Sequence, residues 1–404
     1  MTARERTGWL DDFLGAHTEE LVTFRRQLHA HPELSGQEVE TSAAVAARLE
    51  VAGLEPRLIT NGVGVLCDIG SPGPGTPVVA LRADLDALAM DDEKDVHYAS
   101  QVPGVAHACG HDVHTTVVLG AGLALARYMG EHGVVGGVRL VFESAEETVP
   151  GGALDAIDAG ALEGVSAVYG LHCDPKLDTG RLGTRVGPIS SAADMVRVEL
   201  SGPGGHTARP HETVDLVTVA SRLALELPEE VRDRAARLGT VSLVFGALRT
   251  GAAANVIPTH AELLGSIRTP ERQAWNALPE ILKDALAAVE ADLGVRVTVD
   301  YTRGVPPVVN DEEATRRLER SARTALGSGA LVDAPQSAGG DDFSWYLEQV
   351  PGSYARLGVN DPGDGRDALD LHAGNFDVDE GAIGVGIRVL TAVALDTLAD
   401  AAQT

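Results

Sequence analysis

Strand-like apolar runs alternate with helical segments through the first part of the chain, and this alternation restricts the possible folds more than any other feature. Short apolar runs bounded by turn residues, as expected for strands, occupy residues 62–70, 78–88, 138–144 and 167–173. Between them, residues 111–129 form a longer apolar segment with the length of a helix. Strands that alternate with helices form a parallel or mixed sheet covered on both faces. We therefore predict an α/β domain in which ligands bind beyond the carboxyl ends of the strands.

Near Gly187 the pattern changes to six elements in the order β-α-β-β-α-β. The strands are expected at residues 195–202, 240–251, 257–269 and 295–304, with helices at about 214–227 and 270–292. This order is the split βαβ arrangement of a ferredoxin-like domain. After Pro307 the helix and strand alternation returns. We predict that residues 1–188 and 304–404 form one α/β domain, interrupted by an α+β domain at residues 189–303.

Charge and composition argue against several classes of protein. The formal net charge is −27 at pH 7, so a nucleic acid would be repelled over most of the surface. We expect no membrane span, because no run of eighteen or more apolar residues is present, and the charged N-terminal residues lack the apolar core of a signal peptide. A cytoplasmic location is therefore expected. The three cysteines, Cys67, Cys109 and Cys173, indicate no disulfide framework.

The segment HACGHDVHTT, residues 107–116, is the richest in metal-binding residue types. It holds Cys109, His111 and His114 within six residues. Thiolate and imidazole suit zinc, and also manganese or cobalt when carboxylates complete the ligand set. Cys109 and His111 would share a direction only in extended backbone or at a helix entry. The alternative is an ordinary first turn of a helix with a buried cysteine, and His114 can equally be a core histidine or one that supports a ligand.

Three further segments offer ligands at similar places. Glu146 and Glu147 follow one predicted strand, His172 (less favoured, Cys173) ends the next, and His372 lies in the glycine-containing loop LHAGNF. One thiolate, three imidazoles and a carboxylate suffice for two divalent ions that share a bridging ligand and a water. With Glu147 as a ligand, Glu146 would lie beside that water as a general base. An isolated Glu-Glu pair in an acidic protein is usually a solvated loop, so the prediction depends on all these segments meeting.

Carboxylates also follow the strand that ends in RADLDAL. Asp84 and Asp86 are two residues apart and so lie on one face of an extended chain. A metal-binding histidine often needs a carboxylate to orient its second ring nitrogen, and Asp86 could serve in this way. The alternative is a pair of ordinary loop acids.

The second domain carries three polar residues suited to substrate binding. His206 lies in the glycine-rich segment GPGGHTARPH, and we expect Asn255 and Arg268 on the two central strands. A histidine and an asparagine can stabilise a tetrahedral oxyanion, and an arginine can grip a carboxylate with two hydrogen bonds. Each has an ordinary alternative, such as a glycine-driven turn or a surface ion pair.

Set side by side, these motifs resemble the M20 metallopeptidase family, and most closely its branch of hippurate hydrolases, N-acyl-amino-acid aminoacylases and auxin-conjugate hydrolases. The similarity runs from HPELSGQEVET, where the helical pattern of residues 10–53 breaks, through DLDAL, HACGHDVHT, AEE, GLH, GGHTARPH, NVIP and GGDDFS to LHAGNFDVDE. The resemblance implies a zinc-exopeptidase-like catalytic domain with a mixed sheet, interrupted by the ferredoxin-like domain as a lid. Glu143 and Ser144 stand where the family commonly has Gln-Pro, and Asp341 and Asp342 where Glu-Asp is usual. These departures leave the ligand set intact and bear on the substrate class.

The resemblance also implies a role for each candidate residue. The metal ligands would be Cys109, His111, Glu147, His172 and His372. Glu146 would be the general base and Asp86 an orienting carboxylate. His206, Asn255 and Arg268 would contact the substrate from the lid, and His206 could come from a partner subunit. The cofactor would be two divalent ions per subunit, Zn²⁺ or Mn²⁺, with Co²⁺ as a further option.

The expected reaction is hydrolysis of the amide bond of an N-acyl-amino acid to a carboxylate and a free amino acid. A dipeptidase or other exopeptidase on the same scaffold is one alternative, and a non-catalytic metal- or ligand-binding protein is another. The intact pair of Glu146 and Glu147 argues against the second, because a binding protein needs no base beside its metal. A homodimer through the lid and a monomer both remain open.

Overall fold

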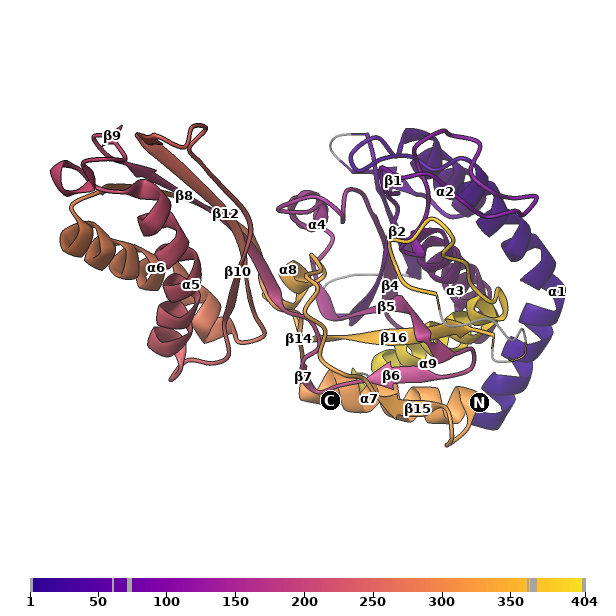
Figure 1. Ribbon diagram of the computed structural model, residues 1–404. Helices are drawn as coiled ribbons and strands as arrows, with labels where there is room; N and C mark the ends of the chain where they lie inside the picture. Colours follow the sequence, from indigo (N-terminus) through magenta and orange to yellow (C-terminus); the bar gives the residue numbers. More distant parts are fainter. Residues whose placement is uncertain (1–2, 60–61, 71–74, 362, 364–368, 402–404) are drawn as a thin grey trace. The chain divides into compact units, whose positions relative to one another are not determined.

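The computed structural model describes residues 3–59, 62–70, 75–361, 363 and 369–401 (Figure 1). The chain forms two compact units, of which the first is discontinuous: it comprises Met1–Gly187, Val309–Pro335 and Asp342–Thr404, and the second comprises Pro188–Val308 and Gln336–Asp341. The expected second domain, residues 189–303, falls within the second unit. Residues 304–308 and 336–341 were expected in the first domain, but the structure groups them with the second unit.

The first unit contains a mixed sheet, which confirms the predicted α/β class. Among the described residues the sheet has eight strands in the order β1-β2-β4-β3-β5-β16-β6-β15. Strand β3 is parallel to both β4 and β5, whereas β2 pairs with β4 in the antiparallel sense. The strands are β1 (Arg57–Leu58), β2 (Val65–Gly70), β3 (Val78–Asp84), β4 (Gly137–Glu143), β5 (Val165–Asp178), β6 (Leu182–Thr184), β15 (Leu331–Asp333) and β16 (Gly352–Asn360).

Helices cover this sheet and form its core with it (Figure 1). Every residue of β3 and of β4 is buried, as expected for central strands with helices on both faces. Helix α3 lies so close to β4 that a Cβ atom added to Gly122 would be 2.3 Å from Leu140 Cδ1. The helices are α1 (Ala3–Ala30), α2 (Val39–Val51), α3 (His111–His132), α4 (Ala153–Asp158), α7 (Glu312–Leu326), α8 (Ser344–Leu347) and α9 (Gly381–Ala401).

Helix α9 requires a correction to the sequence analysis. It has no uninterrupted run of eighteen apolar residues, yet its most apolar eighteen-residue window has a mean hydropathy of 1.7, enough by length and composition for a membrane span. In the structure 67% of that window is buried, and α9 packs against α3 and α7. The apolar composition of α9 is therefore that of a core helix of this unit.

The second unit has the ferredoxin-like order of elements. Its sheet order is β10-β12-β8-β13 with all neighbours antiparallel, and two helices connect the strands in the sequence β-α-β-β-α-β. These elements are β8 (Ala192–Ser201), α5 (Leu216–Ala235), β10 (Ser242–Thr250), β12 (His260–Thr269), α6 (Arg272–Leu293) and β13 (Arg296–Val305). Its shorter elements are β9 (Gly205–His206), η1 (Pro210–Glu212) and β11 (Val256–Ile257); β7 (Gly187–Pro188) spans the boundary between the units in the sequence, and β14 (Val309–Asn310) belongs to the first unit.

The amphipathic pattern of α5 explains how it covers this sheet. Leu223, Leu227 and Val231 recur every four residues and are buried, while Asp215 caps the helix by accepting hydrogen bonds from the amides of Val217 and Thr218.

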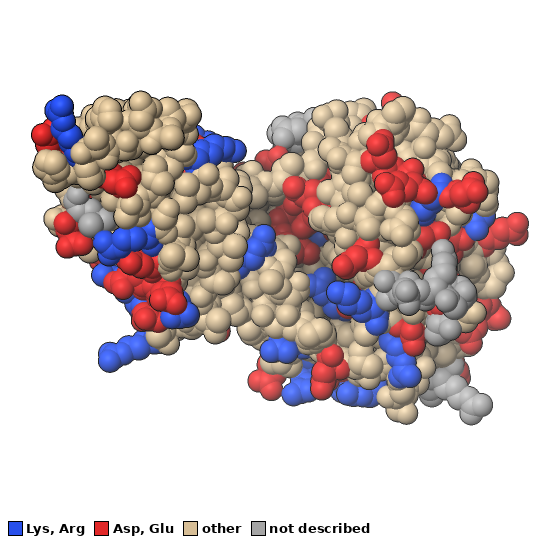
Figure 2. All heavy atoms as spheres, in the orientation of Figure 1, with Lys and Arg blue, Asp and Glu red and all other residues tan. Residues whose placement is uncertain are grey.

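Acidic side chains are spread over the visible face of the first unit (Figure 2), in keeping with the net charge of −27.

Candidate metal centre

Five side chains from four segments of the first unit meet in one cluster. The ligand atoms of Cys109, His111 and His172 lie within 4.8 Å of one another, and so do those of Cys109, Glu147 and His372. The Sγ atom of Cys109 is 3.5 Å from Nε2 of His172, and Oε1 of Glu147 is 3.2 Å from Nε2 of His372. Cys109 belongs to both groups. The arrangement thus offers two adjacent positions for a cation.

One polar atom in this cluster lacks a hydrogen-bond partner. Nε2 of His111 is buried and makes no hydrogen bond with any described residue, and it lies 3.9 Å from Oε1 of Glu147. A buried polar atom without a partner is unfavourable by about 1–3 kcal/mol. A cation between these atoms would remove that penalty, so the donor set fits divalent metal ions.

The entry to α3 explains how Cys109 and His111 point the same way. Helix α3 begins at His111, directly after Gly110, whose φ of 86° lies in the left-handed region. A Cβ atom at Gly110 would lie 2.7 Å from the Sγ atom of Cys173 in β5. Glycine is therefore required both for the backbone turn and for the close approach of the metal-binding loop to the sheet.

Two residues beside the cluster have a strained backbone. Ala145 and His372 each have a φ of 59°, and among the described residues no other residue except glycine has a positive φ. Such a conformation is unfavourable by roughly 1–2 kcal/mol for a residue with a Cβ atom. Ala145 lies in the turn after β4 and directly precedes Glu146 and Glu147. The amide of His372 donates a hydrogen bond to the carbonyl of Ala108 at 2.8 Å. The strain is thus concentrated where the candidate ligands are placed.

Asp86 lies where the sequence analysis expected an orienting carboxylate. Its Oδ1 atom is 3.1 Å from Nδ1 of His111, and its Oδ2 atom accepts hydrogen bonds from the Ser35 hydroxyl at 2.6 Å and the Glu147 amide at 2.9 Å. Burial opposes the charge of Asp86, but His111 and these donors lower the pKa of the carboxyl group below its usual value. Because an ionised carboxylate only accepts, Nδ1 of His111 carries a proton and Nε2 faces the cluster.

His114 is held in a different way. Its Nε2 atom accepts a hydrogen bond from the Cys173 amide at 2.8 Å, so Nδ1 donates to Oδ1 of Asp84 at 2.6 Å. Both ring nitrogens are therefore used within the protein, and no lone pair is left for a metal ion. These contacts argue against a metal-ligand role for His114.

Asp84 also belongs to a buried cluster of charged side chains around Arg82, which the sequence did not reveal. Arg82 donates to Asp84 at 2.6 Å, to Glu143 at 2.8 and 3.0 Å, and to Asp342 at 2.7 Å. Burial disfavours a charge on Asp342, and together with Glu143 it raises the pKa of this carboxyl group well above its usual value. Glu143 and Asp342 belong to the two segments in which the chain departs from the usual family motifs.

In the metal-free chain the candidate ligands differ in protonation. Burial raises the pKa of the Cys109 thiol above its usual value. Burial also lowers the pKa of His172, whereas Asp84, Cys109 and Asp86 together outweigh burial and raise the pKa of His111 well above its usual value. At neutral pH, Cys109 and His111 are thus protonated and His172 is neutral. A metal ion bound by Cys109 and His111 would have to displace these two protons.

In the second unit the structure separates the three residues expected to bind substrate. His206 in β9 is directly opposite Val256 in β11, and the carbonyl of Asn255 accepts a hydrogen bond from the Thr207 amide at 3.3 Å. His206 and Asn255 therefore lie together. Asn255 was expected on a central strand, but it lies in an exposed turn. The GAAAN segment that starts at Gly251 interrupts the strand pattern there.

Arg268 is on the central strand β12, as expected, but at the far end of it. It is opposite Ala193, eight residues from His260, which pairs with Ser201 at the end of the sheet nearest β9. Eight residues of extended chain span about 27 Å. Within one chain, Arg268 and the pair of His206 and Asn255 thus lie at opposite ends of the second unit's sheet.

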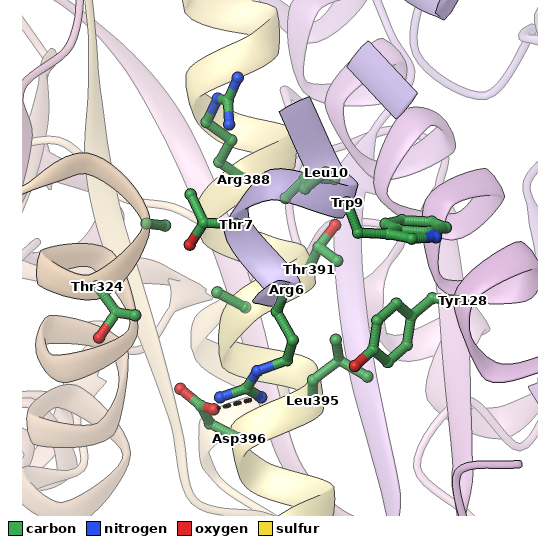
Figure 3. Close-up of a pocket in the computed structure, with 12 residues that line it drawn as sticks. Arg6, Thr7, Trp9, Leu10, Tyr128, Thr324, Arg388, Thr391, Leu395 and Asp396 are labelled. Carbon is green, nitrogen blue, oxygen red and sulfur yellow. Dashed lines mark ion pairs between the residues drawn. The ribbon is translucent and has the colours of Figure 1, made fainter. Parts of the chain in front are cut away.

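A separate pocket in the first unit offers no comparable chemistry. Trp9, Leu10, Tyr128 and Leu395 give it an apolar lining between α1, α3 and α9 (Figure 3). The space that the centre of a water molecule can occupy is about 30 Å³, and an Arg6–Asp396 ion pair of 2.9 Å lies beside it. The pocket has the size and polarity of a packing defect.

Comparisons with known proteins agree with this geometry. The chain is 36% identical to the N-acetyl-L-cysteine deacetylase of Bacillus subtilis, with 90% of this chain and 85% of that protein covered. A solved structure of Bacillus subtilis YXEP, described as a dinuclear metal-binding peptidase from the M20 family, is similar with a TM-score of 0.82 and 31% identity over 95% of this chain and 99% of that chain.

A third relative is longer than this chain. The chain is 47% identical over 376 residues to the putative glutamate–cysteine ligase 2-3 of Rhodococcus jostii. The match covers 93% of this chain but 46% of that protein, so the chain spans about half the length of this relative.

Residues 80–396 match the model of peptidase family M20/M25/M40. The resemblance noted in the sequence is confirmed, and the chain belongs to the peptidase family M20/M25/M40.

Proposed function

We propose that the protein is a dinuclear metal-dependent amidohydrolase that cleaves the amide bond of an N-acyl-amino acid. The observation that carries the proposal is the cluster in which Cys109 is common to two groups of potential ligands, with Glu146 beside it. Oε2 of Glu146 is 3.9 Å from Nε2 of His111. A set of metal ligands together with a further carboxylate is what hydrolysis requires and what a binding site alone does not.

In this proposal Cys109, His111, Glu147, His172 and His372 hold two divalent ions. Mixed sulfur, nitrogen and oxygen ligands accept Zn²⁺, Mn²⁺ or Co²⁺. When bound, such ions supply Lewis-acid polarisation of the acyl carbonyl and lower the pKa of a bound water. The Nε2 atom of His111, which is buried without a hydrogen-bond partner, supports this assignment.

Glu146 is the proton carrier in the proposed reaction. It accepts a proton from the attacking water, whose oxygen bonds to the acyl carbon, and returns the proton to the amine nitrogen as the C–N bond breaks. The products are a carboxylate and a free amino acid. Asp86 acts through His111 and the Glu147 amide, both of which it holds by hydrogen bonds.

We further propose that the second unit supplies the substrate contacts from two subunits. An N-acyl-amino acid is far shorter than the roughly 27 Å of β12 that separates Arg268 from His260, at the end of the sheet nearest His206 and Asn255. One substrate molecule therefore cannot contact all three residues of a single chain. A homodimer that combines Arg268 of one subunit with the pair of the other would provide the carboxylate grip and the oxyanion donors together.

The relatives suggest where a substrate search should start. One is named as an N-acetyl-L-cysteine deacetylase, so N-acetyl-L-cysteine is our first candidate substrate. The three cysteines are free and buried, and Cys109 can act as a ligand only in its reduced form. A reducing compartment, the cytoplasm, is therefore the location that we propose.

The test is a substrate screen of the metal-stripped protein reloaded with Zn²⁺, Mn²⁺ or Co²⁺. N-acetyl-L-cysteine and other N-acetyl- and N-benzoyl-amino acids should be hydrolysed faster than dipeptides, and a chelator should abolish the activity reversibly. Faster cleavage of dipeptides would instead favour the exopeptidase alternative. The Glu146→Gln variant should keep its metal content and lose at least 100-fold in kcat. Full activity in that variant would remove Glu146 from the mechanism.

A further inference from the structure

The motif HPELSG, to which the sequence analysis gave no role at the site, lies against the candidate metal centre. The Ser35 hydroxyl donates a hydrogen bond of 2.6 Å to Oδ2 of Asp86. Three residues later, Oε1 of Glu38 accepts hydrogen bonds from the amide of Gly36 at 2.9 Å and from the amide of Ala145 at 2.7 Å. The segment between α1 and α2 therefore contacts both the orienting carboxylate and the turn after β4.

The contact with Ala145 falls on the most constrained point of that turn. Ala145 has a left-handed backbone, with a φ of 59°, and is followed at once by Glu146 and Glu147. The amide of Glu147 is held by Asp86 at 2.9 Å. The turn is thus held at two amides, by Glu38 before the two glutamates and by Asp86 at the second of them.

We propose that Glu38 is a positioning residue, which holds the turn carrying Glu146 and Glu147 in its working conformation by accepting the hydrogen bond of the Ala145 amide. This inference depends on the proposed function, because it assigns Glu146 and Glu147 their roles. Glu38 itself touches neither a candidate ligand nor the reacting atoms in the contacts described. It acts through the backbone of Ala145.

The role requires one accepting oxygen and no charge. Glu38 is buried, and its second oxygen, Oε2, makes no hydrogen bond with any described residue. Burial raises the pKa of Glu38 to about 7, so the side chain is largely neutral in mildly acidic solution. A glutamine has the same shape and keeps the accepting oxygen, so it should replace Glu38 without loss. An alanine removes the acceptor.

Glu33 provides a matched control in the same motif. Its carboxylate accepts hydrogen bonds from the amides of Glu40 at 3.1 Å and Thr41 at 2.8 Å, in the first turn of α2. Like Glu38, it connects the segment to a neighbouring backbone, but its side chain holds no part of the metal centre. Glu33→Ala should therefore affect the stability of the protein without affecting the turn at Ala145.

The experiment compares Glu38→Ala, Glu38→Gln and Glu33→Ala with the wild type in three measurements. Amide hydrogen exchange at Ala145 is followed by NMR in the metal-free protein. Zn²⁺ affinity is measured by competition with a chelator, and kcat and KM are measured with N-acetyl-L-cysteine as substrate. In Glu38→Ala we expect exchange at Ala145 to be about tenfold faster. We also expect Zn²⁺ affinity and kcat each to fall roughly 10- to 100-fold, with KM within about twofold. Glu38→Gln and Glu33→Ala should match the wild type in all three.

Two results would overturn the inference. The first is a Glu38→Ala variant with the amide exchange at Ala145, the Zn²⁺ affinity and the kcat of the wild type. The second is a Glu38→Gln variant as inactive as Glu38→Ala, which would mean that Glu38 itself donates or accepts a proton in the reaction. If Glu38→Ala does not fold, Glu38→Met fills a similar volume without an acceptor and is judged in the same way. A wild-type protein without amidase activity would contradict the proposed function, whereas exchange at Ala145 and Zn²⁺ affinity would still decide the role of Glu38.

Discussion

Removal and return of the metal ions should change the protonation of the protein by a predictable amount. In the metal-free chain, burial raises the pKa of Cys109, and Asp84, Cys109 and Asp86 raise the pKa of His111 against the effect of burial. Both groups therefore hold a proton at pH 7. Burial lowers the pKa of His172, so this residue has no proton to lose. Loading of the site should release about two protons at pH 7.

The sign and the size of the pH effect follow from this count. Protons compete with the metal ions for Cys109 and His111, so affinity must rise as pH rises while both groups are protonated in the metal-free state. Two protons correspond to roughly a 100-fold gain in the overall binding constant per pH unit. His372 adds a fraction of a proton, because its hydrogen bond with Glu147 raises its pKa above the usual value.

Isothermal titration calorimetry measures this quantity directly. Titration of the metal-free protein with Zn²⁺ at pH 7, in three weakly metal-binding buffers of different ionisation enthalpy, gives the number of protons released from the slope of the observed enthalpy. Cys109→Ala should reduce the number by about one, whereas Cys67→Ala should not, because Cys67 is a buried free cysteine in β2 outside the cluster. A release near zero, or a binding constant independent of pH between 6 and 8, would refute the protonation states assigned here.

Three further predictions concern ligands, orientation and packing. His372→Ala should bind fewer than two metal ions per chain by elemental analysis, and a wild-type metal content would exclude this residue as a ligand. Asp86→Asn should lower Zn²⁺ affinity roughly 10- to 100-fold in a chelator competition, since the carboxylate holds both His111 and the Glu147 amide; an unchanged affinity would contradict its orienting role. Gly122→Ala should destabilise the protein by about 1–3 kcal/mol in urea unfolding, because its Cβ would clash with β4. Gly130→Ala, at an exposed position of α3 with nothing within 4 Å, should stabilise it by about 0.5–1 kcal/mol. Equal effects of the two substitutions would refute the packing argument.

Much of the fold could be predicted because local pattern and overall topology agree. The apolar runs of β3 and β4 match central strands of a sheet with helices on both faces, and the order of elements in the second unit specifies a ferredoxin-like arrangement. Helix α9 shows the limit of composition. Its apolar character alone does not distinguish a core helix from a membrane span, and only its packing against α3 and α7 does so.

The parts of the site that the sequence did not reveal depend on contacts between distant segments. The hydrogen bond from the Ala145 amide to Glu38 joins residues 107 positions apart, and nothing in the spacing of a glutamate after a turn motif indicates it. The distance between Arg268 and His206 likewise follows from the register of β12 and β8, which local pattern does not determine. The motifs could indicate which residues matter, but not which backbone each one holds.

The discontinuous first unit has a consequence for the order of events during synthesis. A ribosome completes Cys109, Glu147 and His172 early, then makes the whole second unit, and reaches His372 only near the end of the chain. The strand pair of β5 and β16 also waits for this last part of the chain. A nascent or truncated chain that ends before His372 therefore has only part of the candidate ligand set, and the full cluster can form only when translation is nearly over.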